Sequence, residues 1–108
     1  MTGQAELVGQ ADFETRVISA SHPVLVDFYA EWCAPCRAVA PMVDRFAAEY
    51  AGRIRVYKVD VDADPELASR YGIRSIPTLM LFNNRAPVET LVGVVAPSRL
   101  SSILDRAA

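Results

Sequence analysis

The strongest chemical signal in the sequence is a pair of cysteines, Cys33 and Cys36, with two residues between them. The pair lies between a predicted strand over residues 24–30 and a predicted helix over residues 34–51, at the strand end where α/β sheets usually carry their sites. Cys33 would stand at the helix start, where unpaired N–H groups and the helix dipole favour a thiolate. Cys36, one turn further on, would lie on the same side of the helix. The spacing predicts that Cys33 attacks a disulfide of another protein and that Cys36 resolves the mixed disulfide.

Three other interpretations of the cysteine pair stay open at this point. A Cys-x-x-Cys segment is half of a zinc site, although the chain has no third cysteine and only one histidine, His22. A purely structural disulfide would close so short a loop that it would stabilise the fold little. Two unreactive buried thiols are the third alternative, although a helix N-terminus favours reactive ones. The acidic series Asp60, Asp62 and Asp64 lacks the glycine and final glutamate of a calcium loop, so it is predicted to be a solvated loop.

Asp27 is the second chemical signal, because it interrupts the apolar strand over residues 24–30 ahead of Cys33. A carboxyl group inside a strand that is covered on both faces loses its hydration, which should raise its pKa toward neutrality. It could then exchange a proton with Cys36 when that thiol attacks or leaves. The alternative is a buried acid that serves structure alone, through hydrogen bonds or an ion pair with Lys58. Lys58 is predicted to be a strand residue whose charged end reaches water, with a role beside Asp27 as the alternative.

Composition and charge are typical of a globular protein. The chain has 108 residues, 52% hydrophobic and 22% charged, which predicts a single domain over residues 1–108. Eleven basic and 13 acidic residues give a net charge of −2, so neither nucleic acid nor an anionic membrane is expected as a partner. No apolar run reaches the length of a membrane span. Residues 1–20 show no apolar signal segment, so we expect a cytoplasmic protein, in which a cysteine pair is more often chemical than structural.

Helical and strand patterns alternate along the chain and predict an α/β layered domain with a mixed sheet. The longest helical pattern places Val39, Val43 and Phe46 on one face. Asp64 and Pro65 predict the start of a short helix. The other predicted elements are a helix over 11–20, strands over 24–30, 53–59, 77–82 and 87–92, a turn at Asn83 and Asn84 between the last two strands, and a final helix with Leu100, Ile103, Leu104 and Ala107.

Four stretches, in order along the chain, resemble the thioredoxin family: residues 26–33 (Val-Asp-Phe-Tyr-Ala-Glu-Trp-Cys), 35–36 (Pro-Cys), 40–41 (Ala-Pro) and 71–78 (Tyr-Gly-Ile-Arg-Ser-Ile-Pro-Thr). A lone Cys-x-x-Cys is a weak signal, whereas these stretches at the family's spacing are specific, and the resemblance runs from about Phe13 to Leu104. It implies the thioredoxin fold, an α/β architecture with a central five-stranded mixed sheet, four flanking helices and a first strand near residues 5–8. It also implies a cis bond between Ile76 and Pro77 that faces the disulfide and leaves the Ile76 backbone free to pair with an extended client chain.

The resemblance also implies a function, that of a protein-disulfide reductase. A flavin-dependent, NADPH-using thioredoxin reductase would return the oxidised protein to the dithiol, and the clients would include ribonucleotide reductase, methionine sulfoxide reductase and peroxiredoxins. No bound cofactor and no metal are implied, and a monomer is expected. The family's client groove carries over to residues around the cysteines, namely Trp32, Ala34, Pro35, Val61, Ile76, Pro77, Val92 and Gly93.

Three positions depart from the family pattern. Ala34 replaces the glycine of the usual Trp-Cys-Gly-Pro-Cys segment, which suits a helical first turn but could change the reduction potential. Arg85 occupies a hairpin position where the family usually has glycine, so we expect Asn83 or Asn84 to take the conformation with positive φ. Tyr29 stands where the family often has a second tryptophan, a change that should affect packing before it affects mechanism.

Two rival functions remain. An oxidase or isomerase would use the same fold with a destabilised disulfide, but such proteins often carry histidine or another polar residue between the cysteines, where this chain has Ala34 and Pro35. A binding or assembly subunit would use the fold without turnover. Its biological activity would survive replacement of Cys33 and Cys36 by serine.

Overall fold

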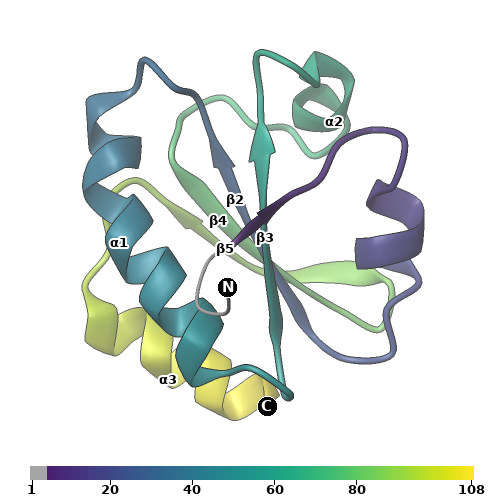
Figure 1. Cartoon of the computed structure of the whole chain (residues 1–108), viewed down its shortest axis with the longest axis vertical. Coiled ribbons are helices and arrows are strands. Elements are labelled where there is room, and N and C mark those ends of the chain that lie inside the picture. The colour runs from purple at the N-terminus through teal and green to yellow at the C-terminus, as the bar shows by residue number, and fades with distance from the viewer. Residues whose placement is uncertain (1–4) are drawn as a thin grey trace.

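A five-stranded sheet organises the chain (Figure 1). The structure is a computed structural model and describes residues 5–108. The strand order is β1-β3-β2-β4-β5, with β1, β3 and β2 parallel and with β4 antiparallel to both β2 and β5. In chain order the elements are β1 (Glu6–Leu7), η1 (Glu14–Ile18), β2 (Val24–Tyr29), α1 (Ala34–Glu49), β3 (Arg55–Asp60), α2 (Pro65–Arg70), β4 (Thr78–Asn83), β5 (Ala86–Val92) and α3 (Pro97–Ala107). This architecture confirms the fold that the resemblance implied.

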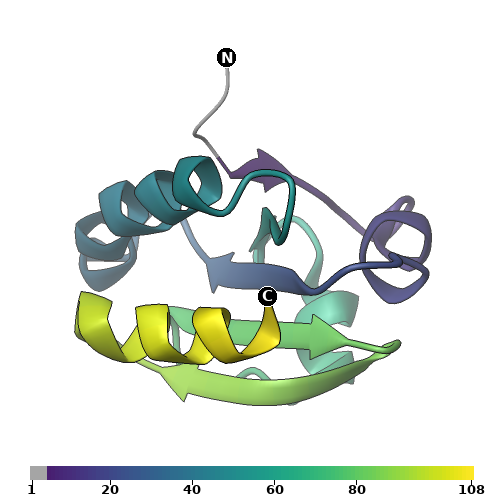
Figure 2. The same cartoon turned by 90° about the horizontal axis from the view of Figure 1, so that it is seen from below.

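The helices cover both faces of the sheet. α1 and α3 pack on one face, η1 and α2 pack on the other, and the sheet lies between these two layers (Figure 2). Along β2, Leu25 belongs to the core under α1 and α3, whereas Val24, Val26 and Phe28 belong to the core under η1 and α2. Because successive residues of a strand point to opposite faces, Asp27 lies on the face that α1 covers.

α1 begins shortly after β2, with Cys33 as its N-cap and Pro35 in its first turn. Proline suits this position, because the first N–H groups of a helix have no partner within the helix. The helix continues through Pro41, and its predicted apolar face is buried at Val39, Val43 and Phe46. Among the described residues, no helix is both long enough and apolar enough to cross a membrane.

The helix predicted over residues 11–20 is much shorter in the structure. The helical element is Glu14–Ile18, a single π-helical turn in which the N–H of Ser19 donates to the carbonyl of Glu14, and its N-cap Phe13 also has helical backbone angles. Phe13 and Val17 are buried as their pattern predicted. After Val17 no residue up to position 20 is fully buried, so the segment gains little by continuing as a helix, because tertiary packing supplies most helical stability.

α2 begins at the predicted position, with Asp64 as N-cap and Pro65 as its first residue. The Asp64 side chain makes no capping hydrogen bond to this helix. Its Oδ1 instead accepts the N–H of Gln10 at 3.0 Å, so Asp64 ties the loop before α2 to the segment that follows β1.

The hairpin between β4 and β5 turns through two residues with positive φ, Asn84 at 54° and Arg85 at 72°. A two-residue turn of type I′ needs positive φ at both central positions, because its twist then matches that of the strands. Asn84 takes this conformation as expected. We expected an asparagine to adopt positive φ in place of Arg85. This expectation was wrong, since the turn requires positive φ at both Asn84 and Arg85. The Arg85 guanidinium lies 3.3 Å from the Glu14 carboxylate, an exposed ion pair.

Replacing Arg85 by glycine should stabilise the protein. The left-handed conformation costs a non-glycine residue about 1 kcal/mol or more, and the exposed ion pair to Glu14 contributes little. After allowance for the extra freedom that glycine gives the unfolded chain, we expect the free energy of unfolding to rise by roughly 0.5 kcal/mol in urea denaturation. Arg85→Ala is the control, because it loses the ion pair but keeps the Cβ atom. An equal gain in both variants would contradict the explanation.

Candidate active site

Strand register brings four chain segments to one edge of the sheet. Tyr29, the last residue of β2, pairs with Asp60, the last residue of β3. On the other side of β2, Phe28 pairs with Thr78, the first residue of β4, and Thr78 in turn pairs with Val92, the last residue of β5. The residues that follow β2, β3 and β5 and those that precede β4 therefore lie side by side.

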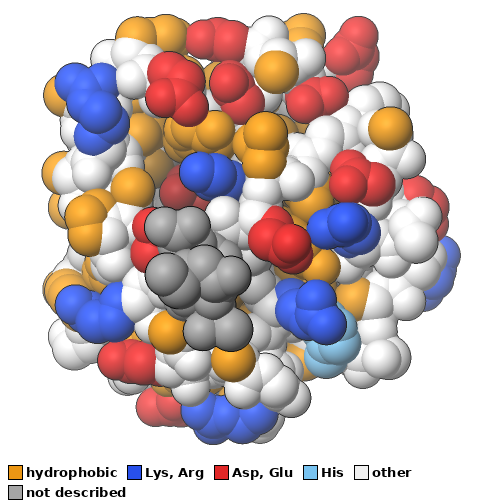
Figure 3. Space-filling view, in the orientation of Figure 1, with side chains coloured by type: hydrophobic (Ala, Val, Ile, Leu, Met, Phe, Trp, Pro, Cys, Tyr) orange, Lys and Arg blue, Asp and Glu red, His pale blue; other side chains and the backbone are white. Residues whose placement is uncertain are grey.

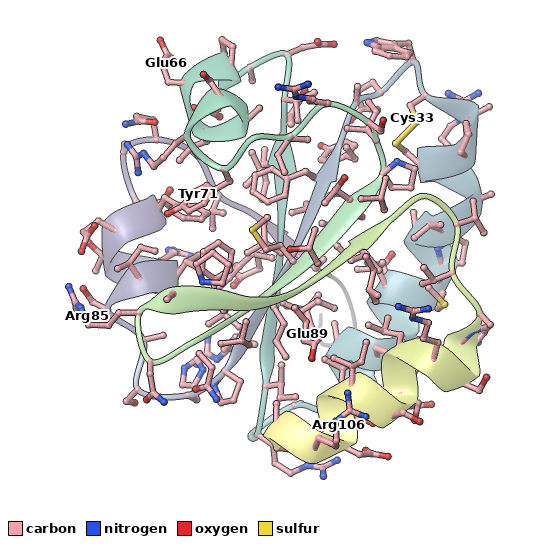
Figure 4. The ribbon with its side chains drawn as sticks, turned by 180° about the vertical axis from the view of Figure 1, so that it is seen from behind. Cys33, Glu66, Tyr71, Arg85, Glu89 and Arg106 are labelled. Atoms are coloured by element: carbon pink, nitrogen blue, oxygen red, sulfur yellow. A yellow bond between two sulfur atoms is a disulfide. The ribbon has the colours of Figure 1, made fainter. Side chains whose placement is uncertain are left out.

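A disulfide between Cys33 and Cys36 lies at this edge, at the start of α1 (Figure 4). The two Cα atoms are 5.2 Å apart, and the N–H of Cys36 donates to Sγ of Cys33 at 3.2 Å. The Cys33 sulfur thus accepts a hydrogen bond from one of the N–H groups that have no partner within the helix at its start. In the part of the chain that the structure describes, no group of three or more His, Cys, Asp or Glu side chains could hold a metal ion.

Both cysteines are almost completely buried, with 3% of each residue exposed. Its place at the start of α1 therefore does not expose Cys33 to solvent. The pair packs with Ala30 in a small core of its own, and Val61 and Ile76 pack against that core. Because the two residues are equally exposed, what distinguishes them is the hydrogen bond at Sγ of Cys33 and the place of Cys33 at the helix start.

The segment before β4 faces the disulfide. The bond between Ile76 and Pro77 is cis, as the resemblance implied. The carbonyl oxygen of Ile76 lies 3.8 Å from Sγ of Cys33. The neighbouring carbonyl of Pro77 accepts the N–H of Gly93 at 2.8 Å, so the ends of β4 and β5 are joined at this point.

All eight predicted groove residues lie at this edge or on the loops that adjoin it. Their exposure differs: Trp32 is 68% exposed and Val92 61% exposed, whereas Pro77 is buried. The others are exposed (Ala34 and Pro35) or half-buried (Val61, Ile76 and Gly93). Together they form an apolar rim around the buried sulfurs.

A small cavity of about 130 Å³ lies between Asp27 and the start of α1, and Asp27, Cys36 and Lys58 line it. Asp27 is 4% exposed, and its Oδ1 has no hydrogen-bond partner among residues 5–108. Loss of hydration raises its pKa from 3.8 to about 7; the charge of Lys58 lowers this pKa and that of Asp44 raises it further. Asp27 therefore changes its protonation state near neutral pH, as the sequence predicted.

Lys58 is the strand neighbour of Asp27 across the β2–β3 pair. Its ammonium lies 5.5 Å from the centre of the Tyr29 ring, within the range of a cation–π contact. The Tyr29 hydroxyl donates to Glu31 at 3.3 Å. Burial and the nearby carboxylates raise the Tyr29 pKa to about 12, so this hydroxyl stays neutral at physiological pH.

Comparison with known proteins agrees with this geometry. A family model described as Thioredoxin matches residues 4–106. The chain belongs to the thioredoxin family. Thioredoxin 1 of Synechococcus elongatus is 50% identical over 102 residues, which cover 94% of this chain and 95% of that protein. Thioredoxin of Pseudomonas aeruginosa is 44% identical over 98 residues, or 91% of each chain, and the chloroplastic M-type thioredoxin of Pisum sativum is 42% identical over 103 residues, or 95% of this chain and 60% of that one.

Thioredoxins are protein-disulfide oxidoreductases, and so is this chain. The exchange between dithiol and disulfide takes place at Cys33 and Cys36, which confirms the activity predicted from their spacing. The family's two cysteines are separated here by Ala34 and Pro35, and α1 accommodates both residues in its first turn.

Sequence reasoning missed several residues of this thioredoxin that adjoin the site. Glu31 and Arg37 line the cavity beside Asp27, and the Arg37 guanidinium donates to the carbonyl of Glu31 at 2.8 Å. Asp62, predicted to belong to a solvated loop, accepts the indole N–H of Trp32 at 2.7 Å. The two partners are 30 positions apart, so no local pattern could have indicated the contact.

Asp27→Asn should stabilise the oxidised thioredoxin, and the gain should grow with pH. The folded protein holds the Asp27 proton up to about pH 7, whereas an unperturbed carboxyl group loses it near 3.8. The unfolded chain therefore ionises first, and the parent loses stability as pH rises through this window. At ~1.4 kcal/mol per pKa unit, the loss amounts to roughly 4 kcal/mol. We expect urea denaturation to show the smallest difference between variant and parent near pH 4 and the largest above pH 7.

Glu66→Gln is the control for this comparison, because it removes an exposed carboxylate from the same protein. Its stability relative to the parent should change little with pH. A difference for Asp27→Asn that stays constant between pH 4 and pH 8 would contradict the assignment of a raised pKa to Asp27.

Proposed function

We propose that this thioredoxin works as a reductant of client disulfides through a thiolate at Cys33, and that an NADPH-dependent thioredoxin reductase returns it to the dithiol. The hydrogen bond from the N–H of Cys36 to Sγ of Cys33, at the N-cap of α1, carries the proposal. This contact and the positive end of the helix dipole favour negative charge on the Cys33 sulfur once the disulfide is reduced. Cys33 would then be the attacking sulfur at neutral pH and Cys36 the resolving one.

The reaction has two exchange steps. The Cys33 thiolate attacks one sulfur of the client disulfide, a mixed disulfide forms, and the other client sulfur leaves as a thiolate that takes a proton from water. Cys36 then gives up its proton and attacks the Cys33 sulfur. The second client thiolate leaves, the Cys33–Cys36 disulfide forms, and the client has gained the two electrons that the dithiol lost.

Asp27 is the group proposed to take the proton of Cys36. Two observations support this role: both side chains line the same cavity, and Oδ1 of Asp27 has no hydrogen-bond partner among residues 5–108. A pKa of about 7 suits a group that must accept a proton in one half-reaction and return it in the other. Lys58, on the neighbouring strand, is proposed to limit how far that pKa rises.

The client is proposed to lie across the apolar rim around the disulfide, with its extended backbone beside Ile76. The rim consists of Trp32, Ala34, Pro35, Val61, Ile76, Pro77, Val92 and Gly93. A shallow apolar surface of this kind suits many partners, each bound weakly. By family resemblance, the proposed clients are ribonucleotide reductase, methionine sulfoxide reductase and peroxiredoxins, and the proposed compartment is the cytoplasm, where such a pair stays available as a dithiol.

Insulin reduction with NADPH and a thioredoxin reductase tests the proposed direction of electron flow. The parent should oxidise NADPH in proportion to the insulin disulfides reduced. Cys33→Ser removes the nucleophile and should lower the rate roughly 1,000-fold or more. NADPH oxidation by Cys33→Ser at the parent rate would overturn the proposal, and so would a parent that oxidises insulin dithiols but does not reduce insulin disulfides.

Cys36→Ser should trap client proteins as mixed disulfides with Cys33, because no second sulfur remains to release them. The adducts should appear on non-reducing gels and disappear with dithiothreitol. Cys33→Ser is the matched control, since it keeps Cys36 and the same serine chemistry. Adducts that form equally well with Cys33→Ser would show that the assigned roles of the two sulfurs are wrong.

A further inference from the structure

Thr78, the first residue of β4, is a buried polar residue that the proposed mechanism does not use; it is 2% exposed. It pairs with Phe28 of β2 and with Val92 of β5, so its backbone is held on both sides. Its Oγ1 donates to the carbonyl of Ser75 at 2.6 Å. A hydroxyl group that reaches back from a fixed strand in this way can fasten the backbone that precedes the strand.

Residues 74–77 lead into β4 and belong to no helix or strand. Within residues 5–108, two hydrogen bonds with nitrogen or oxygen atoms fasten this stretch. In one of them the N–H of Gly93 donates to the Pro77 carbonyl at 2.8 Å. The other is the contact from the Thr78 hydroxyl. Ile76 lies between these two fastenings, so the direction of its carbonyl depends on both.

The Cys33 sulfur lies between two backbone groups that have opposite effects on it. The N–H of Cys36 donates to this sulfur at 3.2 Å, a contact that favours a thiolate. The carbonyl oxygen of Ile76 lies 3.8 Å away. After reduction, a protonated sulfur can donate to this oxygen, whereas the partial negative charge of the oxygen repels a thiolate. The Ile76 carbonyl therefore opposes ionisation of Cys33.

We propose that Thr78 is a positioning residue, which holds the Ile76 carbonyl beside the Cys33 sulfur and so limits how readily the reduced sulfur becomes a thiolate. The proposal rests on the proposed role of Cys33 as the attacking sulfur. Thr78 acts through the backbone that it fastens, because its hydroxyl bonds to Ser75 and to neither sulfur. Such a limit is useful, because a thiol attacks disulfides best when its pKa lies near the ambient pH.

The test measures the rate at which iodoacetamide alkylates Cys33 across the pH range of thiol ionisation. All proteins carry Cys36→Ser, so that a single thiol reacts. Thr78→Val removes the hydroxyl and keeps the shape of the side chain, whereas Thr78→Ser keeps the hydroxyl. Thr90→Val is the matched control, because it makes the same change at an exposed position of β5.

Charged side chains also influence the ionisation of Cys33. Acidic side chains gather at the end of the molecule that carries α2 and the start of α1 (Figure 3). The three substitutions therefore exchange one neutral side chain for another, and every profile is recorded at the same ionic strength. The charged residues on the elements around Cys33 stay the same in all proteins, namely Asp27, Glu31, Arg37, Lys58, Asp62 and Arg74.

For Thr78→Val we expect the midpoint of the alkylation profile to fall by about 0.5 pH unit, which means about threefold more thiolate well below the midpoint. The reason is that the released stretch no longer keeps the Ile76 carbonyl beside the sulfur. Thr78→Ser and Thr90→Val should keep the parent midpoint. Urea denaturation should show a loss of stability for both Thr78 variants, because one loses a buried hydrogen bond and the other a buried methyl group.

An unchanged or raised midpoint in folded Thr78→Val would overturn the inference. An equal fall of the midpoint in Thr78→Ser or in Thr90→Val would also overturn it, because the effect would then not depend on the hydroxyl of Thr78. These outcomes differ from failure of the proposed function, in which Cys33→Ser would reduce insulin at the parent rate.

A second measurement leaves Thr78 intact and decides the case in which Thr78→Val does not fold. In the protein that carries only Cys36→Ser, the carbon-13 signal of the Ile76 carbonyl should shift with pH, with the same midpoint as the alkylation of Cys33. A carbonyl signal that stays constant through this midpoint would overturn the inference, because the oxygen would then not sense the charge on the sulfur.

Discussion

The N–H of Cys36 meets the sulfur of Cys33 because α1 begins shortly after a strand that is buried on both faces. The first N–H groups of a helix have no carbonyl acceptor within the same helix, and here one of them donates to the Cys33 sulfur. Sheet register then aligns the ends of β2, β3 and β5 with the start of β4, so that the Ile76 carbonyl faces the same sulfur. The reacting group and the backbone beside it follow from where one helix starts and how the strands align.

Asp27 shows a conflict between stability and chemistry within the same strand. The covering of β2 that builds the core also removes water from this carboxyl group and raises its pKa to about 7. A buried carboxyl with an unpartnered oxygen destabilises the fold once it is ionised. Asp27 shares a cavity with Cys36, and we propose that this acid exchanges a proton with that thiol. Such a residue lowers the stability of the fold, as functional residues often do, and the proposed proton transfer explains why it is kept.

Sequence patterns predicted the structure well where elements bury continuous apolar faces. β2 and α1 lie within a residue or two of the predicted ranges, because Val24, Leu25, Val39 and Val43 had to be covered. The predictions failed where a segment buries few side chains or where a tight turn sets the backbone conformation. The helix predicted over 11–20 is present but shorter, as the π-helical turn Glu14–Ile18 with Phe13 as its N-cap. The tight hairpin imposes positive φ on an arginine, which residue preferences alone would not suggest.

By itself the sequence determined the chemistry of this thioredoxin: two cysteines one turn apart at a helix start, and an acid inside an apolar strand. These features are local, because the periodicity of a helix or strand decides which neighbours along the chain share a face. Only the tertiary structure decided that the Ile76 carbonyl faces Cys33, that Asp62 accepts the indole N–H of Trp32, and that both cysteines are almost completely buried. Such contacts join residues that are tens of positions apart, and they depend on how whole elements pack, which no local pattern encodes.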